Sequence, residues 1–69
     1  MKLYFENSRG ERRIIAEPKD RDEAWNEIHN FCAERKFTIP YVRSWRDPDG
    51  LKWYDVSSHT EFFILDDRQ

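Results

Sequence analysis

The stretch DRDEAWNEIHNFCAERK, residues 20–36, decides the fold because it separates two regions with the sequence pattern of β-strands. Asp20 and Glu23 have the three-residue spacing of an N-terminal capping box. Apolar residues then recur every three or four positions, as in a helix that packs one face on a sheet: Ala24, Trp25, Ile28, Phe31 and Cys32. We therefore predict one amphipathic helix from about Arg21 to Lys36, with a polar and slightly acidic outer face.

On the N-terminal side of this helix, two short segments have the period-two pattern of β-strands. Leu3 and Phe5 alternate with polar or amphipathic neighbours up to a turn at residues 7–10, and a β-branched segment follows between Arg12 and Glu17. Pro18 cannot donate a hydrogen bond to a strand ladder and closes the second segment. These residues predict a β-hairpin.

On the C-terminal side, three further strands are expected. Two of them flank the turn sequence DPDG at residues 47–50, where proline presets φ and glycine can adopt a positive φ. The run at residues 60–65 is apolar on both faces, which is typical of a central strand. The expected architecture is a single α+β domain over residues 1–69, of order β-β-α-β-β-β, with one helix on a mainly antiparallel sheet and residues 66–69 as a flexible tail.

The composition restricts the class of protein. The chain has 69 residues, enough for one small domain, and its 16% aromatic content favours a globular fold although 38% of the residues are charged. A formal net charge of -2 argues against a strongly basic nucleic-acid binder. The single cysteine, Cys32, cannot form an internal disulfide, so we expect a buried thiol in a reducing cytoplasm. We find neither a signal-peptide core nor an apolar run of membrane-spanning length, and expect no membrane association.

The hairpin around the DPDG turn carries the main candidate surface. The turn can close on Arg46 and Leu51, or one step tighter on Pro48 and Leu51. In both cases the odd-numbered residues of the first strand share a side of the sheet with the even-numbered residues of the second, and Trp53 faces the helix. The opposite side then exposes aromatic and basic side chains: Tyr41, Arg43, Trp45, Lys52 and Tyr54. A β-bulge would reverse the two sides.

Three interpretations of this surface stay open. Cation–π pairs between neighbouring strands can simply stabilise the sheet. Trp, Tyr and Arg are also the residues that most often anchor protein interfaces, and aromatic rings interleaved with cations suit single-stranded nucleic acid. The negative net charge of the chain argues against binding to nucleic acid. Self-association into a homodimer is a further way to cover an exposed apolar patch.

A second candidate site contains Asp55, His59 and Glu61, which supply metal-ligand types, or an acid–base pair, within seven residues. Structural zinc sites use several Cys or His at regular spacing, whereas this chain has only two His. The alternative is a hydrogen-bonded turn in which His59 and Glu61 satisfy backbone groups. Because the sequence has no glycine-rich phosphate loop and no nucleophile motif, we expect no enzymatic activity and no cofactor.

Several segments together resemble a group of small uncharacterised proteins encoded by phages and prophages of Gram-positive bacteria. They are YVRSW at 41–45, DPDG at 47–50, WYDVSSHTEFF at 53–63, LYF at 3–5 and GER at 10–12. The pattern of that group has Gly where this chain has Ser57. The resemblance implies an accessory protein that acts by stoichiometric binding to a host enzyme, a defence nuclease such as a CRISPR effector, or phage nucleic acid. It assigns no functional residue.

From these observations we predict a non-enzymatic binding module of the host bacterial cytoplasm that modulates or inhibits a host or defence macromolecule. The expected interaction surface is the aromatic and basic side of the hairpin, and a protein is the expected partner. Single-stranded nucleic-acid binding is the alternative, and metal binding is the second alternative. The prediction depends on Trp53 being hidden beneath the helix while Trp45 is exposed.

Overall fold

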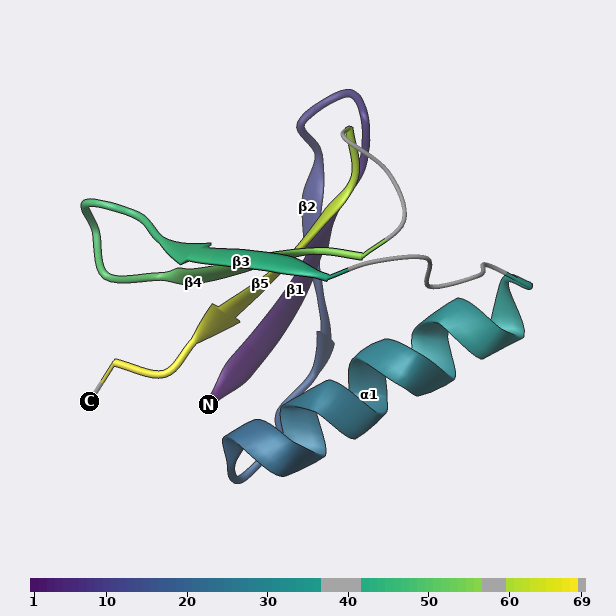
Figure 1. Ribbon diagram of the computed structural model, residues 1–69, viewed down its shortest axis with the longest axis horizontal. Coiled ribbons are helices and arrows are strands. Elements are labelled where there is room, and N and C mark those ends of the chain that lie inside the picture. The colour runs from purple at the N-terminus through teal and green to yellow at the C-terminus, as the bar shows by residue number, and fades with distance from the viewer. Residues whose placement is uncertain (37–41, 57–59, 69) are drawn as a thin grey trace.

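The computed structural model describes residues 1–36, 42–56 and 60–68 and shows one helix against a five-stranded sheet (Figure 1). Strands β1 (Lys2–Glu6) and β2 (Arg12–Ala16) precede helix α1 (Arg21–Glu34), and strands β3 (Arg43–Arg46), β4 (Lys52–Asp55) and β5 (Phe62–Asp66) follow it. The strand order is β2-β1-β5-β4-β3, and neighbouring strands pair antiparallel. The predicted α+β domain of order β-β-α-β-β-β is confirmed.

Strand β5 occupies the centre of the sheet, as its two-sided apolar pattern predicted. It pairs with β1 on one side and with β4 on the other, so the last strand joins the two hairpins. Phe63, Ile64 and Leu65 are all buried. The sheet is strongly twisted, with α1 running along one of its sides (Figure 1). This arrangement leaves the other side of the sheet without a helix.

The hydrophobic core lies between α1 and the sheet side that faces it. Its helical residues are Ala24, Ile28 and Cys32, and its sheet residues include Leu3, Phe5, Val56, Phe63 and Leu65. Phe31 on the helix closes one end of this core, with its ring centroid 4.7 Å from that of Phe5. The predicted burial of Cys32 is confirmed, and this burial raises the pKa of the thiol, as expected for a residue that acts as a small hydrophobe.

The start of α1 follows the sequence prediction, while its end differs by two residues. The Asp20 carboxylate accepts a hydrogen bond of 2.8 Å from the backbone N–H of Glu23, which satisfies one of the free donors at the helix start. At the other end, Lys36 has a φ of 59°, in the left-handed region that an α-helix cannot include. The helix therefore ends at Glu34 rather than near Lys36.

The pairing of β2 with β1 contains a register shift, and this shift places the apolar residues of β2 on both sides of the sheet. Leu3 pairs with Ala16, but the next residue, Tyr4, pairs with Ile14. The extra residue, Ile15, packs with Ala16 against the core. Ile14 consequently lies on the side without the helix, where it is 48% exposed.

The β3–β4 hairpin has a different register from the one predicted, and this reverses its two sides. The Asp47 N–H donates to the Leu51 carbonyl at 2.9 Å, and the Gly50 N–H donates to the Asp47 carbonyl at 3.0 Å. Gly50 has a φ of +89°, so the loop is a turn followed by a left-handed glycine, the arrangement of a G1 bulge. Trp45 therefore pairs with Trp53, and the prediction that Trp53 faces the helix was wrong.

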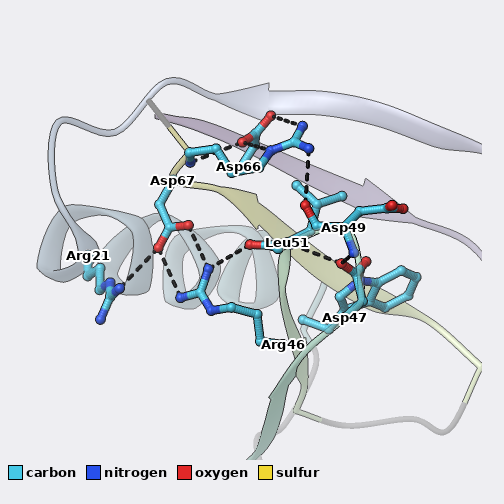
Figure 2. A network of polar contacts seen from close by, with 10 residues as sticks. Arg21, Arg46, Asp47, Asp49, Leu51, Asp66 and Asp67 are labelled. Atoms are coloured by element: carbon cyan, nitrogen blue, oxygen red, sulfur yellow. Dashed lines mark hydrogen bonds and ion pairs between the residues drawn. The ribbon is translucent and has the colours of Figure 1, made fainter.

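Residues 66–68, which were expected to belong to a flexible tail at 66–69, make ion pairs in the structure. Asp66 belongs to β5, and Asp67 accepts hydrogen bonds from Arg21 at 3.1 Å and from Arg46 at 2.8 Å (Figure 2). Arg68 donates to the carbonyl of Asp49 in the β3–β4 loop. Asp67 thus connects the start of α1, the edge strand β3 and the end of β5.

We expect this connection to weaken in acid. Hydrogen bonds from Arg46 and then Arg21 lower the pKa of Asp67 to about 2 from an ordinary value of 3.8. A carboxylate whose pKa is lower in the folded state stabilises the fold above pH 4 or so, and this contribution disappears as the pH falls towards 2. After allowance for solvent screening, the loss is about 1 kcal/mol.

Urea unfolding of the native chain and of Asp67→Asn at several pH values measures this contribution. The native chain should be the more stable near pH 6, and the difference should shrink as the pH approaches 2. A difference that stays constant over this range would show that ionisation of Asp67 does not stabilise the fold.

Candidate interaction surface

The side of the sheet opposite α1 carries a group of aromatic and aliphatic side chains. We call this side the open face and define it by Tyr4, Arg12, Ile14, Trp45, Trp53 and Phe62. Each alternates along its strand with residues of the other side, and cross-strand pairs connect Ile14 to Tyr4 and Trp53 to Trp45. Ile64 pairs with both Tyr4 and Trp53 and is fully buried. The open face therefore has a small apolar base of its own.

Three rings on the open face support one another. Trp45 and Trp53 are stacked, with ring centroids 5.9 Å apart and planes inclined by 19°. Phe62 meets both rings edge-on, at 5.8 Å from Trp45 and 5.4 Å from Trp53. Trp45 lies on the edge strand β3 and is 38% exposed, so the cluster presents one accessible indole held in place by two neighbours.

Asp47 ties this aromatic cluster to the hairpin loop. Its carboxylate accepts a hydrogen bond of 2.7 Å from the indole N–H of Trp53 and bonds of 2.9 Å from the backbone N–H groups of Asp49 and Leu51. The Trp53 hydrogen bond is the largest cause that lowers the pKa of Asp47. One carboxylate thus orients Trp53 and fixes the loop that sets the hairpin register.

The positive charges of the open face are matched by carboxylates. Arg12 places its guanidinium carbon 5.6 Å from the ring centroid of Trp53 and forms a 3.0 Å ion pair with Glu6. Arg43, on the same side of β3 as Trp45, forms a 2.7 Å ion pair with the fully buried Asp55. The surface around the rings is therefore nearly neutral and not strongly basic.

The structure does not bring the five predicted surface residues together. Trp45 is exposed as predicted, and Arg43 shares its side of the sheet. Lys52 and Tyr54 lie on the opposite side, where the Tyr54 ring packs 5.9 Å from Trp25 of α1, and burial raises the pKa of Tyr54. The grouping of these residues on one face was therefore wrong, while Tyr41 lies outside the described residues.

Five members of the open face were not predicted from the sequence: Tyr4, Arg12, Ile14, Trp53 and Phe62. Two sequence signals point to Phe62 and Trp53. Phe62 alternates with Phe63, a core residue of the central strand. Gly50 stands at the fourth position of the DPDG turn, where a positive φ adds one residue to the loop and changes which residues pair across the hairpin.

The predicted metal ligands remain untested as a set. Asp55 is engaged by Arg43, Glu61 lines a cavity beside the end of α1, and His59 lies outside the described residues. Within residues 1–36, 42–56 and 60–68, no group of three metal-ligating side chains is found. Metal binding at Asp55, His59 and Glu61 stays a prediction from the sequence.

Comparison with known proteins gives no further information about this surface. No family model, no curated protein and no solved structure matches the chain. In the part of the chain that the structure describes, no helix has the length and apolar character needed to span a bilayer. The class of the molecule accordingly follows from its own geometry, which is an α+β domain with a helix on one side of an antiparallel sheet and an aromatic open face on the other.

Proposed function

We propose that the chain is a non-enzymatic binding module whose open face docks on an apolar patch of a partner protein. The observation that carries this proposal is the stacked pair of Trp45 and Trp53 on the sheet side that α1 does not cover. Exposed apolar patches on small domains are typical of interaction sites, and tryptophan is among the residues that contribute most to binding.

The rigidity of the cluster supports binding. Phe62 packs against both indoles, and Asp47 fixes Trp53 through a hydrogen bond, so the rings are already ordered in the free protein. A side chain that is ordered before binding loses little conformational entropy when a partner covers it. Trp45 is therefore suited to act as an anchor that inserts into a pocket of the partner.

The charges of the open face favour a protein over nucleic acid. Arg12 and Arg43 are already paired with Glu6 and Asp55, and the chain has a formal net charge of -2. Binding to a phosphate backbone depends on cations that displace counterions, and these two arginines would first have to leave their carboxylates. The two indoles also stack on each other, which leaves only the outer ring for a base.

The resemblance to phage and prophage proteins extends this proposal to the kind of partner. A protein of this type would modulate or inhibit a host or defence macromolecule, such as a CRISPR effector nuclease, by occupying one of its surfaces. The nearly neutral aromatic open face supports stoichiometric docking of this kind, and such docking requires no catalytic group.

A photo-reactive tryptophan analogue in place of Trp45, which keeps the indole ring, tests the proposal in an extract of the cells of origin. We expect a discrete crosslinked protein that survives nuclease treatment and that unlabelled native chain displaces. The Trp45→Ala chain should need a concentration about tenfold higher or more to displace it. The matched control places the same group at position 26, where Asn26 is exposed on the outer side of α1, and should give no such product.

Each other outcome contradicts the proposal in a defined way. A product that disappears after nuclease treatment would identify nucleic acid as the partner. A product of twice the mass of the chain would identify a homodimer. Equal displacement by the native chain and by Trp45→Ala would exclude the open face as the docking surface.

A further inference from the structure

A cavity of about 480 Å³ lies beside the end of α1. Its lining includes two arginines of β2, the arginine that follows α1, one aromatic residue and two acidic residues: Arg12, Arg13, Arg35, Phe5, Glu11 and Glu61. Its volume is within the range of pockets that hold small molecules, roughly 300 to 1,000 Å³. The positive side chains outnumber the acidic ones along its wall.

Two of these arginines differ from all the others in the chain. Six of the eight arginines form ion pairs with carboxylates: Arg9, Arg12, Arg21, Arg43, Arg46 and Arg68. Arg13 and Arg35 have no carboxylate partner among the described residues. The two guanidinium groups without an ion pair therefore line the same cavity, although they come from β2 and from the residue that follows α1.

Phe31 positions both of these guanidinium groups. The guanidinium carbon of Arg35 lies 4.2 Å from the centroid of the Phe31 ring, and that of Arg13 lies 5.9 Å from it. Phe31 is itself held by Phe5 and Phe63, with ring centroids 4.7 and 5.3 Å away. The core thus supports an aromatic platform for two cations whose charge is not neutralised within the described chain.

We propose that this cavity binds the phosphate group of a small phosphorylated ligand. A guanidinium group offers a planar pair of N–H donors that matches phosphate oxygens, and two such groups balance the charge of a phosphate dianion. The carboxylates of Glu11 and Glu61 in the same lining are acceptors for N–H or O–H donors elsewhere on the ligand. They also repel a polyanion, which favours a small ligand over a nucleic-acid chain.

This site shares only Arg12 with the proposed docking surface. Arg13 and Arg35 do not belong to the open face, whereas Arg12 belongs to both sites and is therefore left unchanged in the test. Failure of ligand binding would leave the crosslinking result at position 45 unaffected, and failure of crosslinking would leave the cavity unaffected.

Titration of the ¹⁵N-labelled chain with inorganic phosphate and with adenosine monophosphate, followed by NMR, tests the proposal. We expect saturable shifts at the amides of Arg13 and Arg35, with tighter binding of the nucleotide if its base and sugar use the rest of the cavity. Arg13→Gln should weaken binding about tenfold or more, and Arg13→Lys should fall between it and the native chain because lysine keeps the charge without the paired donors.

The matched control is Arg21→Gln, which removes an exposed cation at the start of α1 that pairs with Asp67, and neither residue lines the cavity. It should leave the affinity within about twofold, as expected for a surface charge outside the cavity. Arg35→Gln provides a second cavity variant, and its NMR spectrum shows directly whether the fold is kept.

Three results would overturn the proposal. One is the absence of saturable shifts at up to about 10 mM ligand, beyond the range of a specific weak site. Another is an equal loss of affinity in Arg21→Gln and Arg13→Gln, which would indicate general attraction to positive charge. The third is binding of acetate as tight as that of phosphate, which would assign the cavity to carboxylates.

Discussion

Replacement of Ile28 by alanine is expected to lower the free energy of unfolding by about 2 to 5 kcal/mol. Ile28 is 0% exposed and lies in the middle of α1, in the core between the helix and the sheet. A chain of this length has a total stability of about 3 to 10 kcal/mol, so the substitution removes a large part of it. Urea unfolding followed by tryptophan fluorescence measures the loss.

Ile14→Ala is the matched control for this prediction. It removes the same atoms from a residue that is 48% exposed on β2, so the expected loss is within about 0.5 kcal/mol. Similar losses in the two variants would contradict the assignment of the core to the side of the sheet that faces α1.

Replacement of Trp53 by alanine is expected to have the second largest effect, about 2 to 3 kcal/mol, because the ring is half-buried and not fully enclosed. The substitution removes the stack with Trp45, the edge contact with Phe62 and the hydrogen bond to Asp47. For a domain of this size, each kcal/mol corresponds to a shift of roughly 4 to 8 °C in Tm. Thermal unfolding followed by circular dichroism measures this shift.

Trp45→Ala is the comparison for Trp53→Ala. Trp45 lies on the edge strand and is more exposed, so its loss should cost about 1 kcal/mol while abolishing the same indole stack. Both variants should lose the coupled indole signal in circular dichroism. A larger loss of stability in Trp45→Ala than in Trp53→Ala would contradict the hairpin register described above.

Local rules were sufficient to predict the elements of this fold. The cap at Asp20, the apolar stripe of α1 and the central position of β5 each depend on a few neighbouring residues. The predicted helix extended two residues too far because its end depends on the backbone of a single residue, Lys36, whose positive φ has no strong sequence signal.

The register of the β3–β4 hairpin could not be obtained from alternation alone. Side chains alternate with a period of two, so a loop longer by one residue exchanges the two sides of the partner strand. The positive φ of Gly50 sets the length of the loop and therefore the register, in which Trp53 pairs with Trp45. The composition of the candidate surface changed with it, whereas the exposure of Trp45 did not.

The cavity and the C-terminal ion pairs could not be predicted from the sequence because they join residues that are far apart along the chain. Only the three-dimensional structure shows that Arg13 and Arg35 have no carboxylate partner among the described residues, whereas the other six arginines each pair with one. Asp67 likewise meets Arg21 and Arg46 only because β5 brings the end of the chain back to the helix start. Contacts between residues so far apart in sequence have no periodic signature.

The left-handed glycine of the β3–β4 loop also bears on how such a surface diversifies. Loss or gain of a single residue in this loop would exchange the side chains of β3 between the two sides of the sheet, with no aromatic residue substituted. The partner that such a chain binds can therefore change through loop length alone, because a different set of side chains then faces the partner.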